Sequence, residues 1–210
     1  MSLKFENIVN TERELREILG YPNEIVLKKT INHIDENCRK FIEKSPFITM
    51  ATSDLNGNFD VSPKGDPAGF VKILNDKTLA IPDRPGNKKA DTLTNIIKNP
   101  NVGLIFLIPG IRETLRVNGV AKIVTDKNIL ELLSCKGKTP SLAIIVEVTE
   151  AFMHCAKCII RSKLWSNHVY DNIEQDMPTL GKVLVEHSKV NMNPDELDER
   201  IRYDEKTNLY

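Results

Sequence analysis

The spacing of apolar side chains changes near residue 46, from a helical period to the alternation of β-strands, and this change separates an N-terminal helical segment from a β-rich domain. Before it, residues 11–44 place apolar side chains at helical spacing, and Gly20-Tyr21-Pro22 separates two predicted helices. Thr11 followed by Glu14 predicts a capping box at the start of the first helix. Apolar positions 31, 34, 38, 41 and 42 predict a buried face on the second helix. We expect these helices to cover one end of the main domain.

From residue 47 onward, alternating positions and short apolar runs are typical of β-strands. Asn56-Gly57 is a hairpin-turn signal between the first two of these runs. Short connections between consecutive strands predict an antiparallel barrel and not a parallel βαβ sheet. The predicted strands span residues 47–53, 59–62, 69–74, 78–81, 102–108, 115–124 and 141–148.

Two helices are predicted inside and after this series of strands. The longer one spans residues 88–99, with Asn87 as its N-cap, Asn99-Pro100 as its stop, and Ala90, Leu93, Ile96 and Ile97 as its buried face. The shorter one spans 128–133. The fold class is therefore mainly β with flanking helices, a six- to seven-stranded antiparallel barrel. We predict a helical segment at 1–45 packed on the barrel, the barrel domain at 46–165, and a helical extension at 166–210.

Charge and hydropathy narrow the classes of function. Twenty-nine basic residues balance 29 acidic ones, which gives no long-range field to attract nucleic acid or an anionic membrane. The longest apolar runs, 102–109 and 142–148, are far shorter than the about 20 residues of a membrane span. The first residues have no basic-then-apolar signal pattern. We expect a cytoplasmic protein that binds neither nucleic acid nor membrane.

Cysteine and histidine add little chemistry. The four cysteines, at 38, 135, 155 and 158, are too few and too scattered for a disulfide framework. Cys155 and Cys158 form one CxxC pair, but a structural zinc site needs a second pair or suitably spaced histidines. We therefore expect ordinary buried or partly buried thiols and predict no metal site. His154, His168 and His187 have no carboxylate partner at catalytic spacing, so no general base and no catalytic residue is assigned.

Three loop segments, 60–70, 81–88 and 112–119, each place a cation at the end of a predicted strand. A phosphate monoester is held well by several charge-assisted hydrogen bonds together with a helix N-terminus. Three such bonds are worth about 5–9 kcal/mol, against about 8 kcal/mol for a micromolar ligand. The alternative is that these charges are solvated loop residues. Ser62-Pro63-Lys64-Gly65 favours function, because proline and glycine fix the shape of this loop. The candidate ligands are Lys64, Arg84, Lys88 and Arg116, with Ser62 and the N–H groups near Asn87.

Several motifs in order resemble one known family. These are Asp-Val-Ser-Pro-Lys-Gly-Asp-Pro (60–67), Ile-Pro-Asp-Arg-Pro-Gly-Asn (81–87), Arg-Glu-Thr-Leu-Arg-Val-Asn-Gly (112–119), His-Cys-Ala-Lys-Cys (154–158) and Ile-Arg-Ser-Lys-Leu-Trp (160–165). The sequence is similar to the pyridoxamine 5'-phosphate oxidase-like flavoproteins, and most of all to FMN-dependent members of unassigned substrate. The resemblance covers about three quarters of the chain. It implies an FMN-binding split barrel with FMN at a homodimer interface.

The resemblance also implies roles for individual residues. Val61, Ser62, Pro63 and Lys64 would follow the flavin and its ribityl chain, beside Ile81 and Pro82. Arg84, Asn87 and Lys88 would reach the phosphate. Arg112, Thr114 and Arg116 would line the site from one strand, with Thr114 where the oxidase itself has glutamine. Arg161, Lys163 and Trp165 would approach the flavin from the partner subunit, although Trp165 by itself reads as a core aromatic.

The chain also departs from that family. The second strand lacks the arginine-rich phosphate motif of the oxidase, and the C-terminal arginine–histidine pattern that binds its substrate is not recognisable. We therefore predict an FMN-dependent oxidoreductase acting on a small, planar substrate other than pyridoxamine phosphate, with Lys64 near the flavin ring. The alternatives are a non-catalytic protein that carries flavin or haem, a deazaflavin-dependent reductase, and a CxxC metal or thiol-redox protein.

Overall fold

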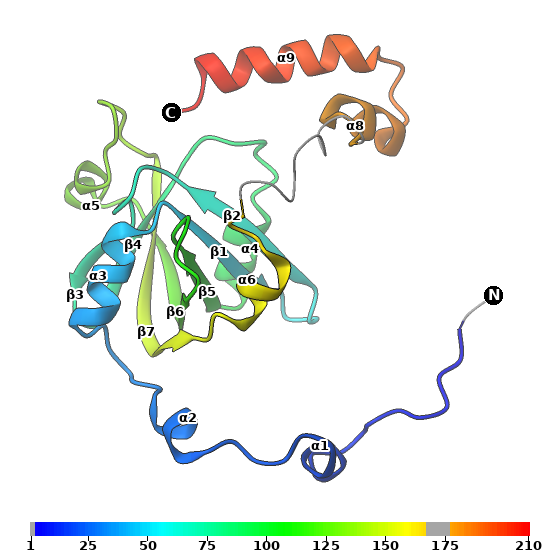
Figure 1. Cartoon of the computed structure of the whole chain (residues 1–210). Coiled ribbons are helices and arrows are strands. Elements are labelled where there is room, and N and C mark those ends of the chain that lie inside the picture. The colour runs from blue at the N-terminus through cyan, green and yellow to red at the C-terminus, as the bar shows by residue number, and fades with distance from the viewer. Residues whose placement is uncertain (1–2, 167–176) are drawn as a thin grey trace.

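The computed structural model describes residues 3–166 and 177–210 and contains one curved β-sheet (Figure 1). Its strands are β1 (Phe47–Ser53), β2 (Phe59–Gly65), β3 (Lys72–Asn75), β4 (Thr78–Asp83), β5 (Asn101–Leu107), β6 (Thr114–Val124) and β7 (Leu142–His154). They pair in the order β2-β1-β5-β6-β7-β4-β3, and every neighbouring pair is antiparallel. The predicted antiparallel barrel with flanking helices is confirmed. The strand predicted at 69–74 begins three residues later than expected.

Alternation along the strands fills the inside of the barrel. In β1, Ile48 and Met50 are fully buried, and in β5 Leu104 and Phe106 are fully buried. The intervening residues of both strands point to the other face of the sheet. This inner set forms the main core together with buried residues of β4, β6 and β7.

The N-terminal helices behave differently from the expectation for residues 11–44. Helix α1 (Glu12–Leu19) has the predicted capping box and ends at Gly20, but neither it nor α2 (Glu24–Lys28) contains a buried residue in the described structure. Only α3 (Glu36–Lys44) packs on the barrel, burying Cys38, Phe41 and Ile42. The prediction that position 31 belongs to this helix is wrong, because Ile31 instead forms a β-bridge with Ala151 of β7.

Helix α4 (Asp91–Lys98) also differs from its prediction, and α5 (Lys127–Leu132) agrees closely. Asn87 is not the N-cap of α4; Ala90 occupies that position in a left-handed conformation. Ile96 is buried as predicted, but Ile97 is 77% exposed. Thr92, which the sequence did not place on the buried face, is buried, and its hydroxyl donates to Asp60 of β2.

The remaining described helices follow the sheet. They are α6 (Lys157–Ser162), α8 (Leu180–Ser188) and α9 (Pro194–Thr207). Helices α8 and α9 pack against each other, and Gly181 allows their close approach, since a Cβ there would lie 2.5 Å from the carbonyl oxygen of Pro194. Figure 1 shows this pair beside the barrel, on the opposite side from α1 and α2. Within the predicted extension at 166–210, the described residues contain helices α8 and α9 with non-helical residues around them, and residues 167–176 lie outside the described residues. No helix in the described ranges is long and apolar enough to cross a membrane.

Candidate functional site

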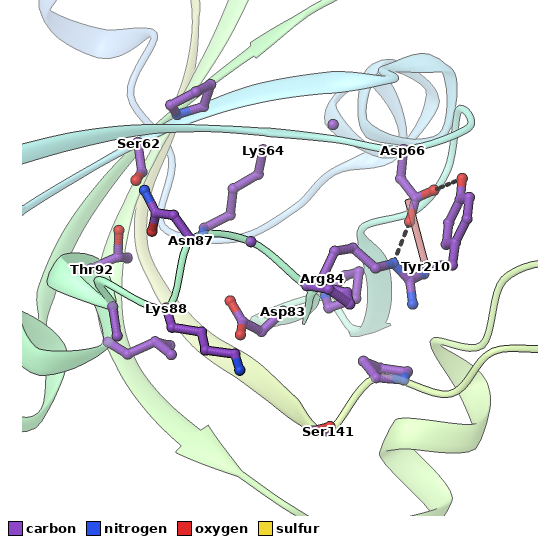
Figure 2. Close-up of a pocket in the computed structure, with 18 of the residues that line it drawn as sticks. Ser62, Lys64, Asp66, Asp83, Arg84, Asn87, Lys88, Thr92, Ser141 and Tyr210 are labelled. Carbon is purple, nitrogen blue, oxygen red and sulfur yellow. Dashed lines mark hydrogen bonds and ion pairs between the residues drawn. The ribbon is translucent and has the colours of Figure 1, made fainter. Parts of the chain in front are cut away.

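A cleft of about 1160 Å³ lies between β2, the end of β4 and the start of α4. Strand β2 lines the cleft with Asp60 and with residues 62–65. Asp60, Ser62 and Lys64 are half-buried, whereas Val61 is exposed on the opposite face of the strand. Figure 2 shows the side chains of Ser62 and Lys64 directed toward the loop that carries Asn87 and Lys88. The cleft therefore brings together two of the three segments that the sequence singled out.

The loop between β4 and α4 has a strained backbone. Lys88 and Ala90 have φ angles of 61° and 58°, in the left-handed region that is unfavourable for residues other than glycine. Each such residue costs about 1–3 kcal/mol and persists where the surrounding structure holds it, often at a binding site. Asn87 supports the loop, because its Oδ1 accepts a hydrogen bond from the Lys89 N–H at 3.0 Å.

The start of α4 faces the cleft with its backbone donors free. Within the described residues, no side chain caps this helix, because alanine at the N-cap cannot accept a hydrogen bond. Asp91 and Thr92, the first two residues of α4, line the cleft. The first N–H groups of a helix carry a partial positive charge and favour anions. The sequence predicted a capping side chain at this helix start. Because Ala90 takes that position and cannot cap, the backbone N–H groups of the first turn can bind an anion instead.

Arg84 is largely committed to the protein itself. Its Nε donates to Asp66 Oδ2 at 2.7 Å and its Nη2 donates to the carbonyl oxygen of Leu133 at 2.8 Å. The side chains of Arg84 and Asp66 are 16% and 2% exposed, so this is a buried ion pair. Among the described residues, none accepts a hydrogen bond from Nη1, so this nitrogen is available to a ligand.

The charges of the cleft nearly balance, with a small positive excess. Five basic residues line it (Lys64, Arg84, Lys88, Lys89 and Lys138), and four acidic ones (Asp60, Asp66, Asp83 and Asp91). Arg84 pairs with Asp66 and Lys89 pairs with Asp91, so three lysines remain against two carboxylates. The hydrogen bond and charge of Asp91 raise the pKa of Lys89 above its ordinary value. The Thr92 hydroxyl donates to Asp60 at 2.6 Å. Lys64, Lys88 and Lys138 line the cleft without an ion pair to any described residue, so these three cations are available to an anion.

The structure groups seven of the fifteen predicted binding residues around the cleft: Ser62, Pro63, Lys64, Pro82, Arg84, Asn87 and Lys88. Ile81 lies beneath them, fully buried in the core. The other seven do not line the cleft of this single chain: Val61, Arg112, Thr114, Arg116, Arg161, Lys163 and Trp165. Their roles stay predictions.

Three of the residues that do not line the cleft have defined surroundings elsewhere in the structure. The guanidinium of Arg116 lies 5.6 Å from the ring centroid of Phe152. The indole Nε1 of Trp165 donates to the carbonyl oxygen of Ile111 at 2.8 Å. Thr114 is buried. Trp165 is thus fixed to the loop before β6.

Sequence reasoning missed part of the cleft wall. Residues 138–141, just before β7, and Leu209 and Tyr210, after α9, line it as well. The proline in Thr139-Pro140 marks a loop, but no local signal connects that loop or Tyr210 to β2. Tyr210 is 144 residues away from Asp66, to which its hydroxyl donates.

The cysteines add no second site. Cys38 is buried, but Cys155 and Cys158 are exposed, which corrects the expectation that they are buried or partly buried. Burial raises the pKa of the Cys38 thiol to about 12. Among the described residues, no group of three or more histidine, cysteine or acidic side chains is arranged to hold a metal ion.

The sequence model of one protein family, described as pyridoxamine 5'-phosphate oxidase, matches residues 34–155. This range covers more than half of the 210 residues and contains all seven strands. Among curated proteins, none matches the sequence.

Solved structures that resemble the chain include three with different descriptions. HupZ of Group A Streptococcus is 20% identical and has a TM-score of 0.49, covering 57% of this chain and 93% of its own. A proposed pyridoxamine 5'-phosphate oxidase from Lactobacillus delbrueckii is 21% identical with a TM-score of 0.47, covering 58% and 95%. A protein described as an F420 reductase is 17% identical with a TM-score of 0.42, covering 58% and 98%. Similarity at this level is no evidence for a shared ligand or activity.

Proposed function

This chain belongs to the pyridoxamine 5'-phosphate oxidase family, and from that membership we propose that it binds FMN in the cleft beside β2. We further propose that it is an oxidoreductase acting on a small substrate. The observation that carries the proposal is the convergence of Lys64, Lys88 and the uncapped start of α4 on one cleft.

The residues present fit the phosphate of FMN. Lys64 and Lys88 supply two ammonium donors, Ser62 a hydroxyl and Asn87 an amide, from two sides of the cleft (Figure 2). Charge-assisted hydrogen bonds contribute about 1.5–3 kcal/mol each, so two lysines and the helix N-terminus together approach the about 8 kcal/mol of a micromolar ligand. The small positive excess of the cleft has the sign that a phosphate requires.

The cleft also has room for more than a phosphate. Ligand pockets commonly have volumes of about 300–1,000 Å³, and this cleft of about 1160 Å³ is open enough for a ligand with a ring system. Pro63, Pro82 and Phe70 give it apolar walls. Bound flavin would supply the hydride chemistry, and the protein would orient it and exclude water.

We propose that two copies of the chain form a homodimer through the outer face of the sheet. Phe59 and Val61 on β2 are 81% and 63% exposed. In the pairing register, Val61 lies opposite Ala51 of β1, and Ile105 of β5 lies opposite Arg116 of β6. Phe59, Val61 and Ile105 are exposed apolar side chains on the outer face of the sheet, and an exposed apolar surface is typical of an interface. Val61 and Arg116 would then act across the interface and not in their own cleft.

The test is the absorption spectrum of the purified protein and the mass of the molecule released by heat. We expect FMN, and we expect Lys64→Ala and Lys88→Ala each to weaken its binding by about tenfold to a hundredfold, the loss of one charged hydrogen bond. Lys122→Ala is the matched control, because Lys122 is exposed on β6 and does not line the cleft. Full flavin retention in both cleft variants would refute the phosphate site.

The same preparation separates the other candidates. A deazaflavin would differ from FMN in mass. Haem would need an axial ligand such as histidine, and none of the described residues that line the cleft is a histidine. Reduction of bound FMN by NADH or NADPH without oxygen would support an oxidoreductase. Stoichiometric flavin that neither donor reduces would favour a carrier. Light scattering gives the oligomeric state, and a monomer that retains flavin would count against the homodimer.

A further inference from the structure

An aromatic ring from the last residues of the sequence fills one end of the cleft. Figure 2 shows Tyr210 beside Asp66 and Arg84, on the side of the cleft opposite Ser62 and Thr92. Tyr210 and Leu209 both line the cleft. The phosphate-binding residues proposed above lie nearer the other end, so the ring occupies a separate part of the same cavity.

The surroundings of this ring match its chemistry closely. The guanidinium of Arg84 lies 5.5 Å from the ring centroid and the ammonium of Lys136 lies 4.9 Å from it. Cations at such distances are attracted to the face of an aromatic ring. The Tyr210 hydroxyl donates to Asp66 Oδ1 at 2.7 Å. Asp66 is buried and its other oxygen accepts from Arg84, so the carboxylate has one lone-pair direction reserved for a donor in the cleft.

Few contacts hold Tyr210 in the cleft. Helix α9 ends at Thr207 and packs mainly on α8. Within the described residues, every hydrogen bond or ring contact that ties residues 208–210 to the barrel belongs to Tyr210. A single side chain held by hydrogen bonds to Asp66 and Cys135 and by two cation contacts can leave without unfolding any strand.

We propose that Asp66, Arg84 and Lys136 form a subsite for a planar aromatic ligand with a neutral hydroxyl donor, and that Tyr210 occupies this subsite until such a ligand displaces it. The two cations hold the ring, and the Asp66 carboxylate accepts the hydroxyl hydrogen. The same carboxylate repels an ionised phenolate. The proposal deepens the proposed function, since it names the class of the second ligand in the cofactor cleft.

The protonation of Tyr210 agrees with this geometry. The hydrogen bond to Asp66, followed by one to Cys135, raises the pKa of Tyr210 above its ordinary value of 10. The subsite therefore favours the neutral phenol. A ligand bound in the same place would experience the same carboxylate.

The test uses 4-methylphenol, which has the same ring and hydroxyl as the tyrosine side chain. Tyr210→Ala leaves the subsite open. Calorimetry should therefore show that 4-methylphenol binds this variant at least about tenfold more tightly than the unaltered protein, in which the subsite is free only part of the time. Tyr210→Phe keeps the ring but loses the hydrogen bond, and we expect intermediate affinity. Tyr203→Ala is the matched control, because Tyr203 is an exposed tyrosine of α9 outside the cleft.

A second probe checks the role of Asp66. 4-Methylanisole has the same ring but no hydroxyl donor, so we expect it to bind Tyr210→Ala at least about tenfold more weakly than 4-methylphenol does. Equal binding of 4-methylphenol to the unaltered protein and both Tyr210 variants, or no binding to Tyr210→Ala, would overturn the subsite. The flavin content of each preparation is measured separately. Absence of flavin with the expected affinity order would refute only the FMN proposal, and full flavin without that order would refute only the subsite.

Discussion

Replacing Asp66 by asparagine removes the negative charge that faces Arg84 while keeping the size of the side chain. The two side chains are 2% and 16% exposed, so water can replace only a small part of the lost interaction. Removing one member of a buried ion pair costs about 3–5 kcal/mol, because the other charge stays buried without compensation. Arg84 retains its bond to the Leu133 carbonyl and some contact with water. We therefore expect a loss of about 3 kcal/mol, at the lower end of this range.

Urea unfolding followed by circular dichroism measures this change. With a slope of about 2 kcal/mol per molar urea, a loss of about 3 kcal/mol lowers the unfolding midpoint by about 1.5 M. The control is Lys28→Ala, which breaks an ion pair whose two side chains are each 75% exposed and should change stability by less than about 1 kcal/mol. The double variant Asp66→Asn with Arg84→Met replaces the uncompensated charge by an apolar side chain, so we expect it to recover part of the loss.

The outcome also decides what Arg84 does. A midpoint for Asp66→Asn equal to that of Lys28→Ala would show that the pair is not important for the fold, and the reasoning from burial would be wrong. A large loss of stability with FMN still bound at Lys64 and Lys88 would assign Arg84 to the wall of the cleft.

Two further predictions concern a close approach and the thiols. Gly119→Ala places a Cβ 2.3 Å from a backbone oxygen of β7, so we expect the free energy of unfolding, measured in urea, to fall by about 1–3 kcal/mol. The control is Gly86→Ala, whose Cβ meets nothing within 4 Å and should leave the unfolding midpoint unchanged. A thiol reagent at pH 8 should label the exposed Cys155 and Cys158 at once and Cys38 only after unfolding, because burial raises the Cys38 pKa to about 12. That raised pKa stabilises the folded state fully below pH 9, its value when unfolded, and the contribution should fall as the pH rises from there toward 12. Rapid labelling of Cys38 in the folded protein, or a stable Gly119→Ala variant, would contradict these accounts.

The sheet was readable from the sequence because its rules are local. Alternation in β1 and β5, the turn at Asn56-Gly57 and the short links between strands each depend on residues within a few positions of one another. The capping box at Thr11 and Glu14 is equally local, and the structure has it. The N-cap of α4 was predicted wrongly, since asparagine is a good cap by propensity but the loop continues in a left-handed path as far as Ala90.

By itself, then, the sequence determined the strands, the barrel class and the loop segments at 60–67 and 81–88 that face one another, because periodicity and turn chemistry are written in neighbouring residues. Only the tertiary structure decided how the cleft is completed. It paired Arg84 with Asp66 and left the start of α4 without a side-chain cap. It also brought Tyr210 into contact with Asp66, although the two residues are 144 positions apart in the sequence. The physical reason is that burial and ion pairing depend on which distant segments meet, and no local pattern records that meeting.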